Sequence, residues 1–280
     1  MKVHVAFQGE IGAYSEMAVY SYFGPSVELK PCRYLSDVFR LVENGECKYG
    51  VVPVENSIEG SVTQTYDLFL VYDLKVCGEA IIRIVHCLIA HPGVRLSDIK
   101  TVYSHPQALA QCRNFLEKLN CEVIPAFDTA GSVKMIKERG LIDAAAIASE
   151  RAAKIYGMNV LVKDIGDSIN NYTRFFVLSK SDAPYTGRDK TSIIFSIKSY
   201  PGSLYRVLGE FAKRNINLTK IESRPTKQTP WEYNFYLDFE GHRTEKHCME
   251  ALEAIKDKTN FIKILGSYPA ASMENSNFYF

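Results

Sequence analysis

The order of apolar segments along this chain constrains its fold more than any other feature of the sequence. Up to about Phe176, short β-branched runs alternate with stretches of helical period, which is typical of an α/β domain with a largely parallel sheet. The polar segment 179–190, which contains Pro and Gly, interrupts this pattern. Beyond it the order is strand, helix, strand, strand, helix, strand, the ferredoxin-like layout. The sequence therefore predicts an α/β fold with a first domain over 1–180, a linker over 181–190, a second domain over 191–270 and a tail over 271–280.

The same patterns place the individual elements. In the first domain we expect strands over Val3–Phe7, Tyr49–Val54, Ile81–Ala90, Thr101–Tyr103, Val123–Phe127, Ala144–Ala148 and Tyr172–Leu178. Helices are expected over Tyr14–Tyr22, Asp37–Glu43, Pro106–Leu119, Gly131–Lys137 and Glu150–Tyr156, with Ser36 and Ser149 as N-caps. In the second domain we expect strands Thr191–Lys198, Leu218–Ser223, Trp231–Phe239 and Phe261–Tyr268, and helices Gly202–Arg214 and Thr244–Lys256.

Composition excludes several classes of function. The net charge is +1 and basic residues are interspersed with acidic ones, so no basic stripe is available for nucleic acid. No run approaches the ~18 apolar residues of a membrane span, and the N-terminal residues do not have the pattern of a signal peptide. The seven cysteines are scattered and odd in number, which indicates reduced thiols. We therefore expect a cytoplasmic protein that binds neither nucleic acid nor membranes.

Four turns share one local pattern: a strand ends in Gly or small polar residues, and a helix begins at once. The turns are GEIGAYS (9–15), ENSIEGSVTQT (55–65), SHPQAL (104–109) and DTAGSV (128–133). In a parallel sheet such turns lie together at the carboxyl edge, where helix N-termini favour anions. Each turn alone is explained by helix capping. The four together predict a site for a small polyanion.

No motif indicates a cofactor or a metal. The chain contains no phosphate-binding P-loop, no dinucleotide fingerprint, no zinc-protease helix and no nucleophile elbow. Isolated histidines such as His86 and His105 are more often packed or surface residues than bases. In the segment DSINNYTRFFVL, Arg174 stands in an apolar frame and needs either a protein carboxylate or an anionic ligand as partner.

The strings GVVPVENSIEGSV, YSHPQALAQC, DTAGSV and NNYTRF, in this order and spacing, resemble those of prephenate dehydratases. The resemblance covers essentially the whole chain. It implies a catalytic domain of two α/β lobes, like those of periplasmic binding proteins, with the active site between them. It also implies a carbon–oxygen lyase without cofactor or metal, in which prephenate loses carbon dioxide and its ring hydroxyl and becomes phenylpyruvate, a step of phenylalanine biosynthesis.

The resemblance assigns roles to particular residues. Thr173 matches the threonine that is proposed to donate a proton to the leaving hydroxyl, Arg174 would bind a carboxylate, and Phe175 would form an apolar wall. Further catalytic positions are Asn56, Ser104 and Gln111, and substrate-binding positions are Thr129 and Asn171.

The segment from Ser199 to Pro225 resembles the amino-acid-binding ACT domain, which implies phenylalanine as a feedback inhibitor bound between two subunits of a homodimer or homotetramer. Gly202 allows close backbone approach of a carboxylate, and Glu222 could hold an ammonium. Ser203 and Asn215 depart from the usual alanine and glycine of the family. The matching effector positions are Gly202, Ser203, Leu204, Asn217, Leu218, Glu222, Ser223, Arg224 and Pro225.

Three alternatives remain open at this stage. The substrate could be arogenate, which differs from prephenate by an amino group on the side chain. The first domain could be a non-enzymatic binding protein for small anions, and the second a dimerisation module without ligand. Because the first strand begins near Met1, we expect a monofunctional enzyme without a chorismate mutase segment.

Overall fold

A computed structural model describes residues 3–226 and 229–272, and it has the expected α/β class. The chain divides into two compact units. The first holds the described residues up to Thr65 and from Ala80 to Phe175, with Ser272; the second holds Tyr66–Glu79 and the described residues of Phe176–Ala271. The domain boundaries drawn from the sequence remain predictions. Of the predicted tail, residues 273–280 lie outside the described residues.

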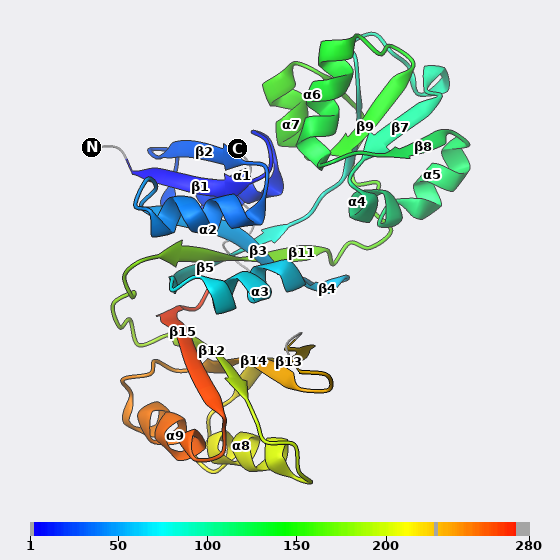
Figure 1. The fold of residues 1–280 in the computed structure, drawn as a ribbon. Helices are drawn as coiled ribbons and strands as arrows, with labels where there is room; N and C mark the ends of the chain where they lie inside the picture. Colours follow the sequence, from blue (N-terminus) through cyan, green and yellow to red (C-terminus); the bar gives the residue numbers. More distant parts are fainter. Residues whose placement is uncertain (1–2, 227–228, 273–280) are drawn as a thin grey trace. The chain divides into compact units, whose positions relative to one another are not determined.

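Before residue 180 the chain alternates strands and helices (Figure 1). The strands are β1 His4–Gln8, β2 Glu28–Cys32, β3 Tyr49–Asn56, β4 Gly60–Ser61, β5 Lys75–Arg83, β6 Cys87–Ala90, β7 Thr101–Ser104, β8 Glu122–Pro125, β9 Ala144–Ala148, β10 Asn159–Val162 and β11 Tyr172–Ser179. The helices are α1 Tyr14–Phe23, α2 Leu35–Glu43, α3 Thr63–Val71, α4 Pro106–Ala110, α5 Arg113–Leu119, α6 Thr129–Arg139 and α7 Glu150–Tyr156, with a short 3-10 helix over Leu96–Asp98.

These strands form two sheets, each the centre of one lobe. The first sheet has the order β2-β1-β3-β11-β5, and β4 pairs with β3. The second has the order β10-β6-β9-β7-β8. Strands β1, β2 and β3 are parallel, as are β7, β8 and β9, whereas β6 and β10 run antiparallel to their neighbours. The two sheets agree with the two lobes that the family resemblance implies. The strand pattern alone predicted one largely parallel sheet, and that prediction is wrong.

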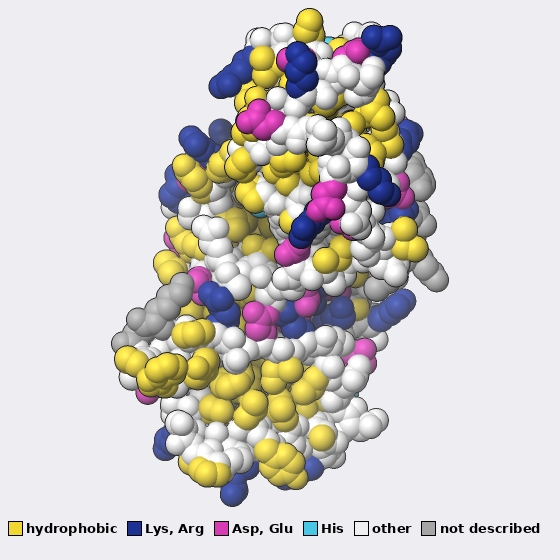
Figure 2. All heavy atoms as spheres, turned by 90° about the vertical axis from the view of Figure 1, so that its right-hand side faces the viewer, with side chains coloured by type: hydrophobic (Ala, Val, Ile, Leu, Met, Phe, Trp, Pro, Cys, Tyr) yellow, Lys and Arg dark blue, Asp and Glu magenta, His cyan; other side chains and the backbone are white. Residues whose placement is uncertain are grey.

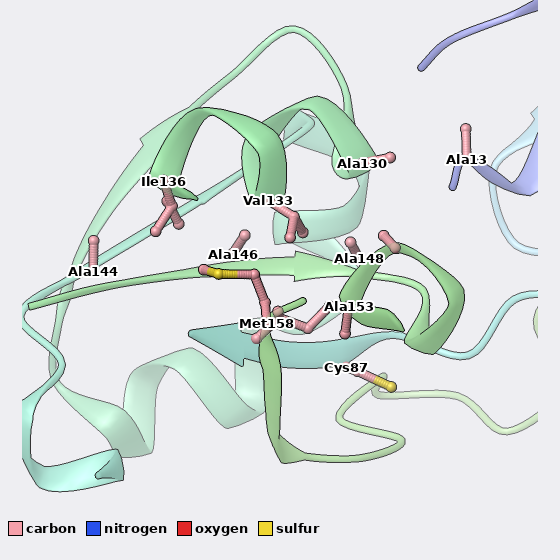
Figure 3. Packing of buried hydrophobic residues seen from close by; sticks show 12 residues of the cluster. Ala13, Cys87, Ala130, Val133, Ile136, Ala144, Ala146, Ala148, Ala153 and Met158 are labelled. Atoms are coloured by element: carbon pink, nitrogen blue, oxygen red, sulfur yellow. The ribbon is translucent and has the colours of Figure 1, made fainter. Parts of the chain in front are cut away.

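Alanines on β9 set the packing of the second lobe. Ala144, Ala146 and Ala148 face one side and belong to a buried cluster with Val133 and Ile136 of α6 (Figure 3). The intervening residues of β9 face the opposite side and pack with α4 and α5. Because successive strand residues point to opposite faces, the run AAAIA is buried on both. Methyl side chains let the helices lie close to the sheet.

Two predicted elements are each divided in the structure. The expected strand Ile81–Ala90 breaks at residues 84–86, because the Ile84 N–H donates to the Asn171 carbonyl rather than to a neighbouring strand. The expected helix Pro106–Leu119 breaks near Gln111, whose carbonyl accepts from Asp167 N–H at 2.7 Å. The Asp167 carboxylate accepts from the first turn of α5 and caps it. Both breaks depend on a distant segment, residues 167–171, that local patterns do not reveal.

Of the two N-cap residues predicted from the sequence, Ser149 is confirmed and Ser36 is wrong. Ser149 caps α7, since its hydroxyl accepts from Ala152 N–H at 3.1 Å. Ser36 is not a cap: α2 begins at Leu35, and Tyr34 is its N-cap residue without a side-chain hydrogen bond. The elements β2, β4, β10 and α3 were not predicted.

After residue 188 the chain has the expected βαββαβ order, within the second unit. Its strands form an antiparallel sheet of order β13-β14-β12-β15. Both helices pack on one face of that sheet around Phe195, Phe211 and Phe239 (Figure 1). The elements are β12 Asp189–Ser196, α8 Ser203–Ala212, β13 Leu218–Pro225, β14 Tyr233–Glu240, α9 Lys246–Lys256 and β15 Phe261–Pro269. Over residues 3–226 and 229–272, no helix has the length and apolar character that a membrane crossing needs.

Candidate active site

A cavity of about 400 Å³ lies in the first unit, and all four of the turns singled out in the sequence line it. This volume falls in the usual range for small-molecule sites, ~300–1,000 Å³. Each turn contributes at least two residues: Gly9 and Tyr14, Asn56 and Val62, His105 and Gln107, and Asp128 and Thr129. The turns come from both sheets, so the cavity joins the two lobes as expected.

Side chains cap two of the helices that begin at the cavity. The Asp128 carboxylate accepts from Gly131 N–H at the start of α6, and Nδ1 of His105 accepts from Gln107 N–H at 3.2 Å. Burial raises the pKa of Asp128, while the Gly131 N–H opposes that rise. Burial also lowers the pKa of His105. Both residues therefore shape the cavity wall through helix capping.

Thr173 and Asn56 meet in the wall of the cavity. Nδ2 of Asn56 donates to the Thr173 hydroxyl oxygen at 3.0 Å, and both side chains are at most 9% exposed. Because the Thr173 oxygen accepts this bond, its own hydrogen stays available for another acceptor; among the described residues it donates to none. Donation into an oxygen also makes its hydroxyl a stronger donor. Asn56 is thus a polarising neighbour for the threonine.

A second pair of predicted residues extends this contact. The Asn171 oxygen Oδ1 accepts from Asn56 Nδ2 at 2.8 Å, and Nδ2 of Asn171 donates to the Gln111 oxygen Oε1 at 2.8 Å. Gln111 lines the cavity, whereas Asn171 is not among its lining residues. The structure therefore brings four predicted residues into one continuous row of hydrogen bonds, Thr173, Asn56, Asn171 and Gln111.

The remaining predicted catalytic residues take different positions. Phe175 is buried and lines the cavity. Arg174 is not among the lining residues. Its Nη2 lies 3.3 Å from Oε2 of Glu55, so of the two predicted partners, a protein carboxylate or an anionic ligand, the structure contains the carboxylate. Ser104 is fully buried at the end of β7 and donates to the Ile147 carbonyl at 2.6 Å. Ser104, like Arg174, is therefore not a lining residue of the cavity.

Two residues that line the cavity, Arg33 and His86, were not predicted as site residues from the sequence. Arg33 is the one Lys or Arg among its described lining residues, and its guanidinium lies 5.3 Å from the Tyr34 ring and 5.1 Å from the Phe127 ring. Aromatic faces attract a guanidinium, so these rings hold it at the cavity wall. His86, judged an isolated histidine, also lines the cavity and is buried. Neither residue belongs to the four turns, and no local pattern marks them.

The predicted effector residues form two groups in the second unit. Gly202 ends the loop after β12 and has φ +80, with open space where a side chain would stand; Ser203 is buried at the start of α8. Pro225 pairs with Tyr233, at the same end of the sheet as Ser196, which precedes that loop. The residues of this first group are Gly202, Ser203, Leu204, Ser223, Arg224 and Pro225, and Glu222 lies near the middle of β13.

The second group, Asn217 and Leu218, lies at the opposite end of β13. Seven residue steps separate Leu218 from Pro225, which corresponds to about 23 Å along a strand. One chain does not bring the two groups together. The family departure at Asn215 is explained by its φ of +55, a left-handed conformation that asparagine adopts more readily than most residues.

Comparison with known families gives two matches. The family described as prephenate dehydratase matches residues 5–183, and the ACT domain matches residues 191–257. Among curated relatives, the bifunctional chorismate mutase/prephenate dehydratase of Aquifex aeolicus is 46% identical over 98% of this chain and 75% of its own length. The arogenate dehydratase/prephenate dehydratase 2 of Arabidopsis thaliana is 44% identical over 96% of this chain and 73% of its own length.

Solved structures agree in fold. Prephenate dehydratase from Arthrobacter aurescens in complex with L-Phe has a TM-score of 0.88 and 35% identity, covering 96% of this chain and 90% of that chain. A structure described as GqqA, a novel type of quorum quenching acylase, has a TM-score of 0.88 and 32% identity, covering 97% and 99%. The two proteins carry different descriptions on the same fold.

Proposed function

Because this chain belongs to the prephenate dehydratase family, we propose that its cavity carries out the decarboxylation and dehydration of prephenate to phenylpyruvate. The family and the relatives are named as dehydratases, and a dehydratase activity is a lyase activity. The observation that carries the proposal is the contact between Asn56 and Thr173 in the cavity wall. It leaves the threonine hydroxyl free to donate to the oxygen that departs from the ring.

The reaction needs positioning and hydrogen bonds. Carbon dioxide leaves as the bond between the ring and its carboxylate breaks, the electron pair of that bond moves through the ring, and the hydroxyl opposite departs as hydroxide, which takes up one proton from solvent to become water. The ring becomes aromatic, which drives the step. Thr173 donates to the departing oxygen, Gln111 and Thr129 contribute hydrogen bonds to the substrate, and Phe175 packs against the ring. Asn56 and Asn171 hold this arrangement.

Two carboxylates make the substrate a dianion, and among the described lining residues Arg33 is the one Lys or Arg that can pair with them. Arg33 is exposed at the cavity, so it can attract a carboxylate from solvent. Arg174 is held by Glu55, and its proposed contribution is to fix the strand that carries Thr173 and Phe175. Ser104 fixes the end of β7 in the same way.

Arogenate is the second candidate substrate, since one relative is named for both activities. Arogenate carries an ammonium where prephenate carries a ketone, so its net charge is less negative. A cavity whose lining includes the exposed Arg33 and the half-buried Asp128 offers partners for either sign. Separate steady-state assays with each substrate decide the question: we expect the larger kcat/KM with prephenate. If neither substrate is consumed faster than in buffer, the proposed function fails.

We propose that the second unit binds phenylalanine as a feedback inhibitor between two copies of the chain. The complex of the Arthrobacter aurescens enzyme with L-Phe supports this choice of ligand. The two groups of effector residues lie at opposite ends of β13, so a partner chain that supplies the second group next to the first completes the site.

A second chain also has a surface to bind. β13 is an edge strand, and Ile221, Trp231 and Tyr233 are 45%, 84% and 38% exposed. Figure 2 shows apolar side chains gathered on this unit. Such patches mark interfaces, which supports a homodimer or homotetramer. Sedimentation velocity with and without phenylalanine tests this: we expect an assembly of two or four chains, and a monomer would contradict it.

We further propose a cytoplasmic location. All seven cysteines are free thiols in the structure, and six of them are buried. Free thiols are typical of reducing compartments.

A further inference from the structure

The row of hydrogen bonds behind Thr173 continues past Gln111 to two side chains that the proposed mechanism leaves unused. Oε1 of Gln111 lies 2.9 Å from Nε2 of His86, and Nδ1 of His86 lies 3.2 Å from the Tyr14 hydroxyl. His86 is 3% exposed, and both rings line the cavity. The two rings meet edge to face with centroids 5.8 Å apart. This part of the wall is therefore ordered by specific contacts from three separate segments.

The direction of each bond in the row follows from the backbone. Oδ1 of Asn56 accepts from two backbone N–H groups, at 3.0 and 3.1 Å, so the other side-chain atom is the amide nitrogen. That nitrogen donates to Asn171, which therefore presents its oxygen. The amide nitrogen of Asn171 is left to donate, so Gln111 presents an oxygen to it. The same Gln111 oxygen faces His86.

A carbonyl oxygen only accepts hydrogen bonds, so Nε2 of His86 carries a hydrogen. We infer that His86 is a positioning residue for the dehydration: its Nε2–H holds the Gln111 oxygen in the row and leaves the Gln111 NH₂ group for the substrate. Among the described residues that NH₂ group has no acceptor, and Gln111 lines the cavity. Tyr14, whose hydroxyl donates to the Val85 carbonyl at 2.8 Å, confines the other edge of the imidazole.

The inference rests on the proposed function, because it assigns the Gln111 NH₂ group to a substrate that accepts hydrogen bonds. Without the His86 donor, only Asn171 holds the Gln111 oxygen. The carboxamide then turns more freely and spends part of its time with the oxygen toward the substrate. An oxygen there repels a carboxylate or a departing hydroxide, where the NH₂ group stabilises it.

Two substitutions test the donor while keeping the volume similar. A glutamine side chain places an amide nitrogen near the position of Nε2, whereas leucine places none. We expect His86→Leu to lower kcat for prephenate about 10- to 100-fold and His86→Gln to stay within about fivefold of wild type. Thermal unfolding of both variants controls for folding. Equal losses in the two variants would overturn the inference, since a merely structural role does not depend on the donor.

The protonated nitrogen can also be observed without turnover. Long-range ¹H–¹⁵N NMR of the wild-type chain, with His86 assigned through the His86→Gln variant, distinguishes a hydrogen on Nε2 from a neutral ring protonated on Nδ1 alone. We expect hydrogen on Nε2; protonation on Nδ1 alone would overturn the inference. If the wild-type chain does not convert prephenate, the proposed function fails while this spectrum still decides the state of His86.

Discussion

Replacing Thr173 with valine removes one hydroxyl and keeps the branched shape, so it separates the chemistry of this residue from its packing. In the structure, Nδ2 of Asn56 lies 3.0 Å from the Thr173 oxygen, 2.8 Å from Oδ1 of Asn171 and 3.2 Å from the Tyr172 carbonyl oxygen. The amide nitrogen carries two hydrogens, so two acceptors still remain for them in the variant. We therefore expect the free energy of unfolding to fall by less than about 1 kcal/mol.

The effect on catalysis is far larger. Loss of a positioned donor to the leaving group costs about 10²- to 10⁴-fold in rate, or about 3–5 kcal/mol of activation free energy. The assay is phenylpyruvate formation from prephenate, followed by alkaline absorbance, with thermal unfolding measured on the same samples. Thr173→Ser keeps the hydroxyl and is the matched control. A valine variant with kcat within tenfold of wild type refutes the assignment of Thr173 as the donor.

Three further substitutions test other parts of the structure. Arg33→Gln is expected to raise KM for prephenate about three- to tenfold with kcat nearly unchanged, because one exposed cation at the cavity is lost. Arg95→Gln, outside the cavity lining, is the control. Equal KM values for the Arg33→Gln variant and the wild-type chain would contradict the role of Arg33. Gly12→Ala is expected to lower the free energy of unfolding by about 2–3 kcal/mol in denaturant titrations. The reason is that Gly12 has φ +94 and an added Cβ would lie 2.9 Å from the Ala152 Cα. An unchanged denaturant concentration at the unfolding midpoint would refute the expected strain. Hydrogen bonds from Arg214 and Lys213 lower the pKa of Glu210 to about 2. The Glu210 carboxylate therefore stabilises the fold fully above its unfolded pKa of about 4.5, and this stabilisation is lost as the pH falls toward 2. Glu210→Gln should lower Tm by about 2 °C at pH 7, and an equal difference in Tm at pH 2 would contradict a role for the ionised carboxylate.

Local sequence patterns were sufficient where an element depends on its own residues. The βαββαβ unit was predicted in order because β12, β14 and β15 contain apolar runs and each helix has a clear apolar face. β13, with the sequence LTKIESRP, has neither an apolar run nor an alternating pattern. The four turns were found because a helix start has its own local chemistry, such as the cap at Asp128. Within each sheet the turns collect at the carboxyl edge, after β1 and β3 in the first sheet and after β7 and β8 in the second. The meeting of the two edges in one cavity was expected only from the family resemblance, because the strand pattern predicted one sheet.

The parts that were missed depend on distant contacts. β2 contains Lys30 and Pro31 and has no strand period, and it forms because β1 offers it a parallel partner. His86 carries no sequence signal, because its role depends on Gln111, which is 25 positions away. The interruption between α4 and α5 depends on Asp167, a residue from another segment, whose N–H donates to the Gln111 carbonyl. Pairings of this kind are set by tertiary structure, which a single sequence does not display.

The most direct test of the central claim measures carbon dioxide and phenylpyruvate together, after prephenate is added to the purified chain at neutral pH. We expect both products to form in equal amounts, far faster than in buffer. We also expect the Thr173→Val variant to approach the buffer rate while Thr173→Ser stays active. If the wild-type chain and buffer alone give the same rate for both products, the cavity between the two lobes does not carry out this reaction.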